Sequence, residues 1–276
     1  MAHAHDEERY WNEEGGSNWV RFIDRLERML EVLTPHLVNA VAAQPGERVL
    51  DVGCGGGPTS AAYADAVGSE GHVIGADISA PILALARKRF GHLENLEFLT
   101  ADAGTHAFEP DSFDVFTSRF GVMFFPDRDA AFANIHRALK PGGRACFMCW
   151  RTIKENPWMG EGAQAAFEFV TPPEKPAPGA PGPFSLGDQE QTRALMAGAG
   201  FKNIEFNAVD ENVSLGTVAE TLDWLTSMGP AAKPIEEAEP AAQEKAVAAM
   251  RAAFEARLTD SGVVFPGAVW IVRAQA

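Results

Sequence analysis

The segment from Val49 to Ser60, VLDVGCGGGPTS, constrains the fold more than any other part of the chain. Val49, Leu50 and Val52 form the short apolar run of a strand that is covered on both faces. The glycines that follow let the backbone turn tightly and approach a ligand closely, because glycine has no Cβ. Pro58 suits the first turn of a helix. The segment predicts a strand, a glycine turn and a helix, which together make a nucleotide-type binding turn.

The spacing of these glycines argues against a dinucleotide. The dinucleotide fingerprint is G-x-G-x-x-G/A. Its third position falls on Pro58 if the pattern starts at Gly53, and on Ser60 if it starts at Gly55. The pattern present is instead D-x-G-x-G-x-G, beginning at Asp51. A carboxylate there fits an ammonium or a sulfonium better than a pyrophosphate.

Predicted strands and helices alternate from residue 48 to residue 150. The expected strands are 48–52, 72–76, 96–99, 113–117 and 145–150, and the expected helices are 58–67, 80–90 and 129–139. This alternation predicts right-handed crossovers and a mostly parallel sheet with helices on both faces. Residues 141–143 (PGG) are expected to form a turn into the fifth strand. Residues 1–17 are polar and expected to be mobile, and an amphipathic helix from Trp19 is expected to end before Pro35.

The pattern changes after residue 150. The expected elements are helices at 160–170, 189–199, 219–228 and 236–258 and strands at 201–209 and 263–272. The Pro- and Gly-rich segment 171–183 favours a stiff, extended loop. It could link two domains or drape over the active site; we favour the second, because sheet-like sequence resumes after it.

Composition excludes several partners. The net charge is −15 and the pI is about 4.9, which argues against binding to nucleic acid or to an anionic membrane. No apolar run approaches a membrane span and no signal peptide is visible, so we expect a cytoplasmic protein. Cys146 and Cys149 fall on one expected strand, where residues three apart point to opposite faces. We therefore expect buried, inert thiols and no metal site.

The motif that begins at Asp51 resembles motif I of the class I S-adenosylmethionine-dependent methyltransferases. The resemblance covers residues 48–150, and the stretches 118–126 and 131–144 are similar to the group that includes ubiquinone and menaquinone methyltransferases. It implies a Rossmann-like, seven-stranded, mostly parallel sheet with a helical cap, S-adenosylmethionine as cofactor and a small-molecule acceptor. The expected units are an N-terminal lid helix (1–44), a cofactor-binding core (45–150), and the rest of the sheet with the cap helices and Pro-rich loop (151–276).

The resemblance also assigns roles to residues at the strand ends. Asp51, with the turn, would hold the amino-acid part of the cofactor, Asp77 the ribose hydroxyls and Asp102 the adenine amino group. The full set of expected cofactor-binding residues is Asp51, Gly53, Gly55, Asp77, Ile78, Ala101, Asp102, Ala103, Ser118 and Arg119. Alternatives stay open: Asp77 could cap a helix, Asp102 could be a solvated loop residue, and Arg119 could form a structural ion pair.

The acceptor site is less constrained by the sequence. The expected acceptor-binding residues are Trp11, Trp19, Phe120, Met123 and Trp150. These side chains, with cap aromatics such as Trp158 and Trp224, indicate an apolar or aromatic acceptor, although hydrophobic anchoring would also explain them. Transfer would be an in-line displacement driven by proximity and exclusion of water. No catalytic base is assigned; the histidines considered are His36, His106 and His136.

Two other functions remain open. One is a catalytically silent domain that keeps the methyltransferase fold for a structural or regulatory role. The other is an NAD-dependent oxidoreductase, which the missing third glycine disfavours. Methylation of protein or nucleic acid is less expected, because Ser118-Arg119-Phe120-Gly121 stands where an Asn-Pro-Pro-Tyr-like motif would be. We expect a monomer or a homodimer.

Overall fold

The chain folds around one twisted sheet whose strand order is β3-β2-β1-β4-β5-β8-β6, with a short β7 pairing with β8. This computed structural model describes residues 8–175, 177 and 179–276. The strands are β1 (Arg48–Val52), β2 (His72–Asp77), β3 (Leu96–Thr100), β4 (Phe113–Arg119), β5 (Leu139–Trp150), β6 (Lys202–Ser214), β7 (Leu258–Thr259) and β8 (Gly262–Gln275). Strands β1 to β5 pair in parallel, whereas β8 runs antiparallel to both β5 and β6. The predicted seven-stranded, mostly parallel sheet is confirmed.

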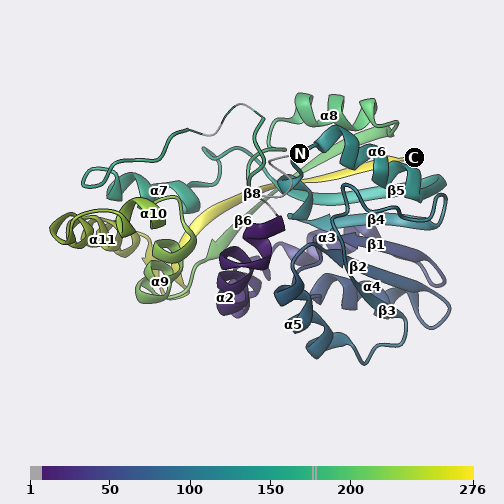
Figure 1. Cartoon of the computed structure of the whole chain (residues 1–276), viewed down its shortest axis with the longest axis horizontal. Helices are drawn as coiled ribbons and strands as arrows, with labels where there is room; N and C mark the ends of the chain where they lie inside the picture. The colour runs from purple at the N-terminus through teal and green to yellow at the C-terminus, as the bar shows by residue number, and fades with distance from the viewer. Residues whose placement is uncertain (1–7, 176, 178) are drawn as a thin grey trace.

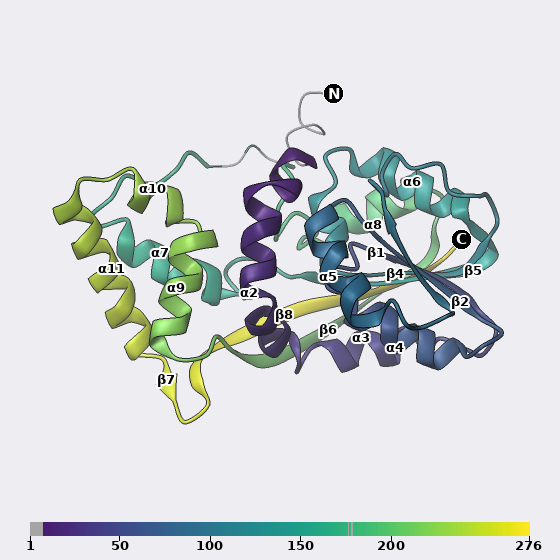
Figure 2. The same ribbon diagram turned by 60° about the horizontal axis from the view of Figure 1, so that its bottom comes forward.

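Helices cover both faces of the sheet. α3 and α4 lie against one face, and α6 and α8 lie against the other (Figure 2). The helices are α2 (Glu14–Leu30), α3 (Thr34–Val41), α4 (Pro58–Val67), α5 (Ala80–Phe90), η1 (Gly121–Phe124), α6 (Arg128–Ala138), α7 (Pro157–Ala166), α8 (Gln189–Gly198), α9 (Val218–Met228), α10 (Ala232–Glu236) and α11 (Pro240–Glu255).

A cap of helices lies beyond one end of the sheet. α7, α9, α10 and α11 gather where the long strands β6 and β8 extend past their neighbours, and α2 stands between this cap and the core (Figure 1). α11 packs on α7 and α9, while α2 packs on α5 and α9. The helix α2 therefore contacts both the core, through α5, and the cap, through α9.

Three local expectations are corrected, and one is confirmed. Residues 141–143 lie within β5 rather than before it: Phe113 pairs with Leu139 and Val115 with Arg144, so the extra β5 residues form a bulge. Residues 14–17 belong to α2, whereas residues 1–7 lie outside the described part of the chain. The helix expected from Trp19 does end before Pro35, because α2 ends at Leu30; Pro35 stands in the first turn of the next helix, α3. The helix expected at 236–258 is shorter: α11 begins at Pro240 and ends at Glu255, and Glu236 belongs to the short helix α10.

The interior is apolar, and it contains the three cysteines as free, buried thiols. Burial raises the pKa of the Cys146 thiol to about 12. Within the described residues no helix is long and apolar enough to cross a membrane. No group of acidic, His and Cys side chains there could hold a metal ion.

Candidate functional site

The glycine turn after β1 is built on left-handed backbone. Gly53 and Gly55 have φ angles of +64° and +56°, where a Cβ is disfavoured. A Cβ on Gly53 would lie 2.6 Å from the Cα atom of Gly121, whereas a Cβ on Gly55 would meet no atom within 4 Å. The Gly55 N–H donates to Asp77 Oδ2 at 2.9 Å, so β2 holds the turn in place.

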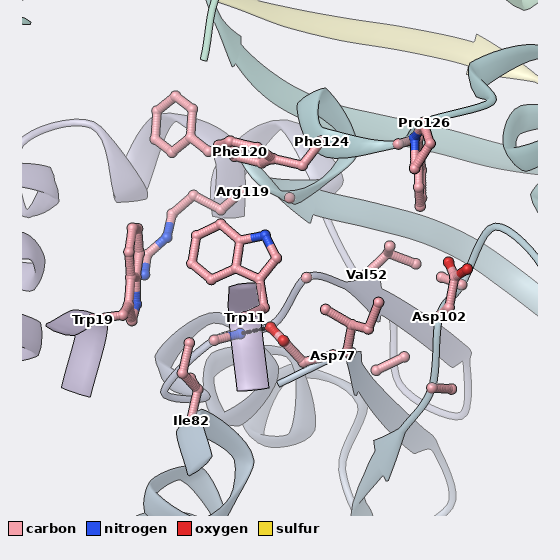
Figure 3. A pocket seen from close by; sticks show the side chains of 18 residues that line it. Trp11, Trp19, Val52, Asp77, Ile82, Asp102, Arg119, Phe120, Phe124 and Pro126 are labelled. Carbon is pink, nitrogen blue, oxygen red and sulfur yellow. Dashed lines mark hydrogen bonds between the residues drawn. The ribbon is translucent and has the colours of Figure 1, made fainter. Parts of the chain in front are cut away.

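A cavity of about 130 Å³ lies at the carboxyl ends of β1 to β4, and we name it the strand-end pocket (Figure 3). It brings together eight of the ten residues expected to bind the cofactor. They are Gly53, Gly55, Asp77, Ile78, Ala101, Asp102, Ala103 and Arg119. The other two, Asp51 and Ser118, are buried and do not line this pocket.

Asp51 lies behind the turn and is 1% exposed. Its Oδ2 atom accepts hydrogen bonds from Thr59 Oγ1 at 2.8 Å and Ser60 Oγ at 2.7 Å. Its Oδ1 atom is buried and has no partner among the described residues. Burial raises the pKa of Asp51 to about 6, although the two hydroxyls and the charge of Arg119 act in the other direction. This carboxylate can therefore support a positive charge on the far side of the turn.

Asp77 ends β2 with both carboxylate oxygens in use. Oδ1 accepts from the Ser79 N–H at 2.9 Å, and Oδ2 accepts from Gly55. Burial raises the pKa of Asp77, and the backbone donors lower it. Ser79, not Asp77, caps α5, since its hydroxyl accepts from the Ile82 N–H. Each Asp77 oxygen keeps a further lone pair, so the carboxylate can accept hydrogen bonds from a ligand in the pocket.

Asp102 is fixed by its own loop at the β3 side of the pocket. Oδ1 accepts from the Gly104 N–H at 2.8 Å, and Oδ2 accepts from Thr105 Oγ1 at 3.0 Å. These bonds hold the carboxylate in one orientation. Ala101 and Ala103 flank it and supply an apolar surface to the same cavity.

Arg119 is the last residue of β4 and the one cationic side chain among the described residues of the strand-end pocket. Its Nη1 atom donates to Thr34 Oγ1 at 2.7 Å. Burial lowers the pKa of Arg119, while the charges of Asp51 and Glu27 raise it. The guanidinium therefore stays charged at the end of the pocket opposite Asp102 (Figure 3).

A second cavity, of about 360 Å³, lies between α2, the ends of β4 and β5, and the cap; we name it the aromatic pocket. All five residues expected to bind the acceptor line it: Trp11, Trp19, Phe120, Met123 and Trp150. Four side chains line both cavities: Trp11, Trp19, Phe120 and Phe124. The two pockets are therefore neighbours across a shared aromatic wall.

Aromatic rings in contact form one wall of the aromatic pocket. The ring centroids of Phe120 and Trp150 are 4.5 Å apart, those of Trp150 and Trp158 are 5.1 Å apart, and those of Trp158 and Trp224 are 5.9 Å apart; the first and last pairs are stacked and the middle pair is tilted. This row of rings joins the end of β4 and β5 to α7 and α9. Its described lining contains no Asp, Glu, Lys, Arg or His.

Pro183 also lines the aromatic pocket, and it belongs to the Pro-rich segment expected to lie over the active site. Sequence reasoning missed Met159 and Met228, which line the same pocket. They come from the cap, and no local pattern in the sequence distinguishes them from ordinary core residues. Leu26, Met29 and Leu30 belong to the apolar stripe of α2, and they line the pocket as well as packing in the core.

The candidate histidines stand away from both described pocket linings. His36 contacts Glu211. The ring of His106 meets that of Phe108 edge to face, and the ring of His136 meets that of Phe201 in the same way. None of the three lines either cavity. The site thus has no histidine base among the residues that form its walls.

The N-terminal segment closes the outer side of the strand-end pocket. Ser79 Oγ donates to the Trp11 carbonyl at 2.6 Å. Asn12 donates to the Ile78 carbonyl at 3.0 Å and accepts from the Ala80 N–H at 2.9 Å. These bonds fix the Trp11 indole within the pocket, close to Asp77 (Figure 3).

Comparisons with known proteins identify the family. A methyltransferase-domain family model matches residues 49–143. The demethylmenaquinone methyltransferase of Staphylococcus carnosus is 30% identical, over 67% of this chain and 80% of that protein. The ubiquinone/menaquinone biosynthesis C-methyltransferase UbiE of Shewanella frigidimarina is 28% identical, over 64% of this chain and 75% of that protein.

Solved structures share the fold at lower identity. YcgJ of Bacillus subtilis superposes with a TM-score of 0.58 at 17% identity, covering 88% of this chain and 97% of that one. Phosphoethanolamine N-methyltransferase 2 of Haemonchus contortus superposes with a TM-score of 0.57 at 20% identity, covering 92% of this chain and 56% of that one. With the strand order and the glycine turn, these findings show that the chain belongs to the class I S-adenosylmethionine-dependent methyltransferases of the ubiquinone/menaquinone type.

Proposed function

We propose that this methyltransferase binds S-adenosylmethionine in the strand-end pocket and methylates a small apolar or aromatic molecule held in the aromatic pocket. The observation that carries the proposal is the wall that the two cavities share, formed by Trp11, Trp19, Phe120 and Phe124. The cofactor supplies a methyl group on a sulfonium, which a nucleophile attacks in line. A junction between the two cavities is where such an attack can occur.

The strand-end pocket fits this cofactor by its own chemistry. The Asp77 carboxylate has lone pairs free for two ribose hydroxyls, and Asp102 can accept from the adenine amino group. Gly55 leaves open the space that a Cβ would fill. Ile78, Ala101 and Ala103 offer apolar surface for a purine ring. Asp51, buried behind the turn, would favour the cofactor's positive charge.

The aromatic pocket supports an acceptor that brings its own nucleophile. Its described lining offers no carboxylate, imidazole or amine to take a proton. The protein then acts by orientation and by excluding water, and orientation alone can contribute roughly 7–11 kcal/mol. Relatives named for demethylmenaquinone and for ubiquinone/menaquinone biosynthesis support a ring-containing acceptor. We further propose a cytoplasmic monomer or homodimer that does not act on nucleic acid or at a membrane.

The cofactor assignment is tested by calorimetry with S-adenosylhomocysteine and with NADH. We expect micromolar binding of the first and none of the second. Asp77→Ala should weaken S-adenosylhomocysteine binding by about 30-fold or more, because hydrogen bonds to a charged group are worth roughly 1.5–3 kcal/mol each. Asp188→Ala is the matched control: it removes an exposed aspartate that caps α8 and lines neither described pocket. Binding of NADH alone would overturn the proposal.

The acceptor assignment is tested by following transfer of a labelled methyl group to a panel of naphthols, catechols and thiophenols. Met228→Trp should fill part of the aromatic pocket, because Met228 lines that cavity and not the other. We expect turnover to fall at least about tenfold while S-adenosylhomocysteine binding stays within about twofold. Val32→Trp, at a position 43% exposed, controls for the added indole. Cofactor binding without transfer to any compound would favour the silent-domain alternative.

A further inference from the structure

The polar groups of the strand-end pocket are arranged in a row. The strand order β3-β2-β1-β4 sets Asp102 at one end, Asp77 next to it, then the glycine turn, and Arg119 at the other end. Three strand spacings, roughly 14 Å, separate the ends of the row. Hydrogen-bond acceptors therefore occupy one half of the pocket, and the one described cation occupies the other. An elongated ligand bound along this row would have hydrogen-bond acceptors beside one of its ends and a guanidinium beside the other.

The guanidinium of Arg119 is only partly used by the protein. It makes one hydrogen bond to a described residue, Thr34. No described carboxylate forms an ion pair with it: Glu27 is paired with Arg89 at 2.7 Å, and Asp51 Oδ2 is held by two hydroxyls. A guanidinium carries five N–H donors in a planar fork that matches a carboxylate. Most of that fork remains available to a ligand.

The surroundings of Arg119 favour a ligand inside the pocket over one from outside. Its outer side adjoins a shallow depression lined by Asp24, Glu27 and Glu31, with Arg28 beside them. An anion approaching from that direction would meet these three carboxylates, of which Asp24 and Glu27 are paired with Arg89. Arg119 does not line the aromatic pocket, so it is not placed to bind the methyl acceptor there. The anionic group that meets Arg119 must belong to the ligand of the strand-end pocket.

We propose, on the basis of the cofactor site proposed above, that Arg119 binds the α-carboxylate of the cofactor's amino-acid end and selects against a decarboxylated cofactor. Thr34 and the charge of Asp51 hold the guanidinium in position for this contact. Figure 3 shows its side chain extending along the pocket wall by Phe120 and Trp19, away from Asp102. Arg119 is thus a specificity-determining residue, because it binds the α-carboxylate, which a decarboxylated cofactor lacks.

The test is a double-mutant cycle with one change on the protein, Arg119→Met, and one change on the ligand, removal of its carboxylate. The wild-type protein and Arg119→Met are titrated by calorimetry with S-adenosylhomocysteine and with its decarboxylated analogue, S-adenosyl-3-thiopropylamine. The wild type should bind S-adenosylhomocysteine about 30-fold more tightly, as expected for a charge-assisted bond. Arg119→Met should bind the two ligands with affinities within about threefold of each other. Arg119→Lys should restore part of the preference, since lysine keeps the charge but not the fork.

Each other outcome overturns the inference. Unchanged S-adenosylhomocysteine affinity in Arg119→Met would show that the guanidinium does not bind the carboxylate. An equal loss for both ligands would show a structural role, because only a carboxylate contact changes their ratio. Equal affinity of the wild-type protein for both ligands would overturn the inference, and this result can be obtained even if Arg119→Met does not fold. A wild type that binds neither ligand overturns the proposed cofactor site as well, so the two failures are distinguishable.

Discussion

Gly121 and Gly53 meet backbone to backbone: a Cβ atom placed on Gly121 would lie 2.7 Å from the Cα atom of Gly53 and 2.8 Å from the Val52 carbonyl oxygen. This contact joins the start of η1 to the turn after β1. Both residues line the strand-end pocket. The shape of that pocket therefore depends on two elements whose backbones touch where no side chain could fit.

Gly121→Ala should destabilise the protein and weaken cofactor binding. The added methyl group meets backbone atoms, which cannot move as a flexible side chain can, so we expect a loss of about 1–3 kcal/mol in the free energy of unfolding. Displacement of Gly53 should also weaken S-adenosylhomocysteine binding by about tenfold or more. Urea denaturation and calorimetry measure the two effects.

Gly198→Ala is the matched control for this prediction. Gly198 is the last residue of α8, and a Cβ there meets no atom within 4 Å. Alanine is the better helix former, so this variant should be neutral or more stable by up to about 1 kcal/mol. Equal behaviour of the two variants would contradict the role given to the Gly53–Gly121 contact.

Asp51 should make the protein less stable as the pH rises from 4 to 7. Burial raises the pKa of Asp51 from 3.8 to about 6 in the folded state. Between these values the folded state binds more protons than the unfolded state, so stability falls with increasing pH. The total change is about 3 kcal/mol, and it is complete once the pH exceeds the folded pKa.

Asp51→Asn isolates this effect, because an amide oxygen can still accept from Thr59 and Ser60 but does not titrate. We expect the free energy of unfolding of the variant, relative to wild type, to rise between pH 4 and pH 7. Asp77, whose pKa is also raised by burial, is present in both proteins, although its charge also raises the pKa of Asp51 in the wild type. A difference that stays constant across this range would show that Asp51 does not titrate there.

The core elements could be predicted from the sequence because their signals are local. β1, α4 and α5 have the expected bounds, and each is marked within a few residues by an apolar run, a Pro at the helix start or a Ser cap. The bulge in β5 could not be predicted, because it depends on how Leu139 and Arg144 pair with β4. A Pro-Gly-Gly sequence reads as a turn until that partner is known.

The aromatic pocket could not be predicted from the sequence either, because its walls come from segments far apart in the chain. Trp150 and Trp158 are close in sequence, but Trp224 reaches them only because α11 packs on both α7 and α9. Periodicity indicates that each helix has an apolar face but does not say which of those faces meet. The sequence therefore predicts aromatic residues near the acceptor and leaves the cavity that they enclose to the tertiary structure.

The hydrogen bonds that attach the N-terminal segment to the core should control the rates at which the cofactor binds and dissociates. The strand-end pocket has a volume of about 130 Å³, which is small beside the roughly 300–1,000 Å³ of small-molecule sites. The Trp11 indole stands within it, next to Asp77 (Figure 3). We infer that Trp11 moves when the cofactor binds, and that the hydrogen bonds of Asn12 to Ile78 and Ala80 resist this movement.

Asn12→Ala should therefore open the segment more often without unfolding the protein. Loss of the two hydrogen bonds, each worth about 0.5–1.5 kcal/mol, should speed amide hydrogen exchange in residues 8–13 by about tenfold. Stopped-flow tryptophan fluorescence should show faster association and faster dissociation of S-adenosylhomocysteine. Asn207→Ala, on the exposed face of β6, should change neither rate. Faster exchange with unchanged binding rates would mean that Trp11 does not obstruct the cofactor, and that the pocket is entered by another route.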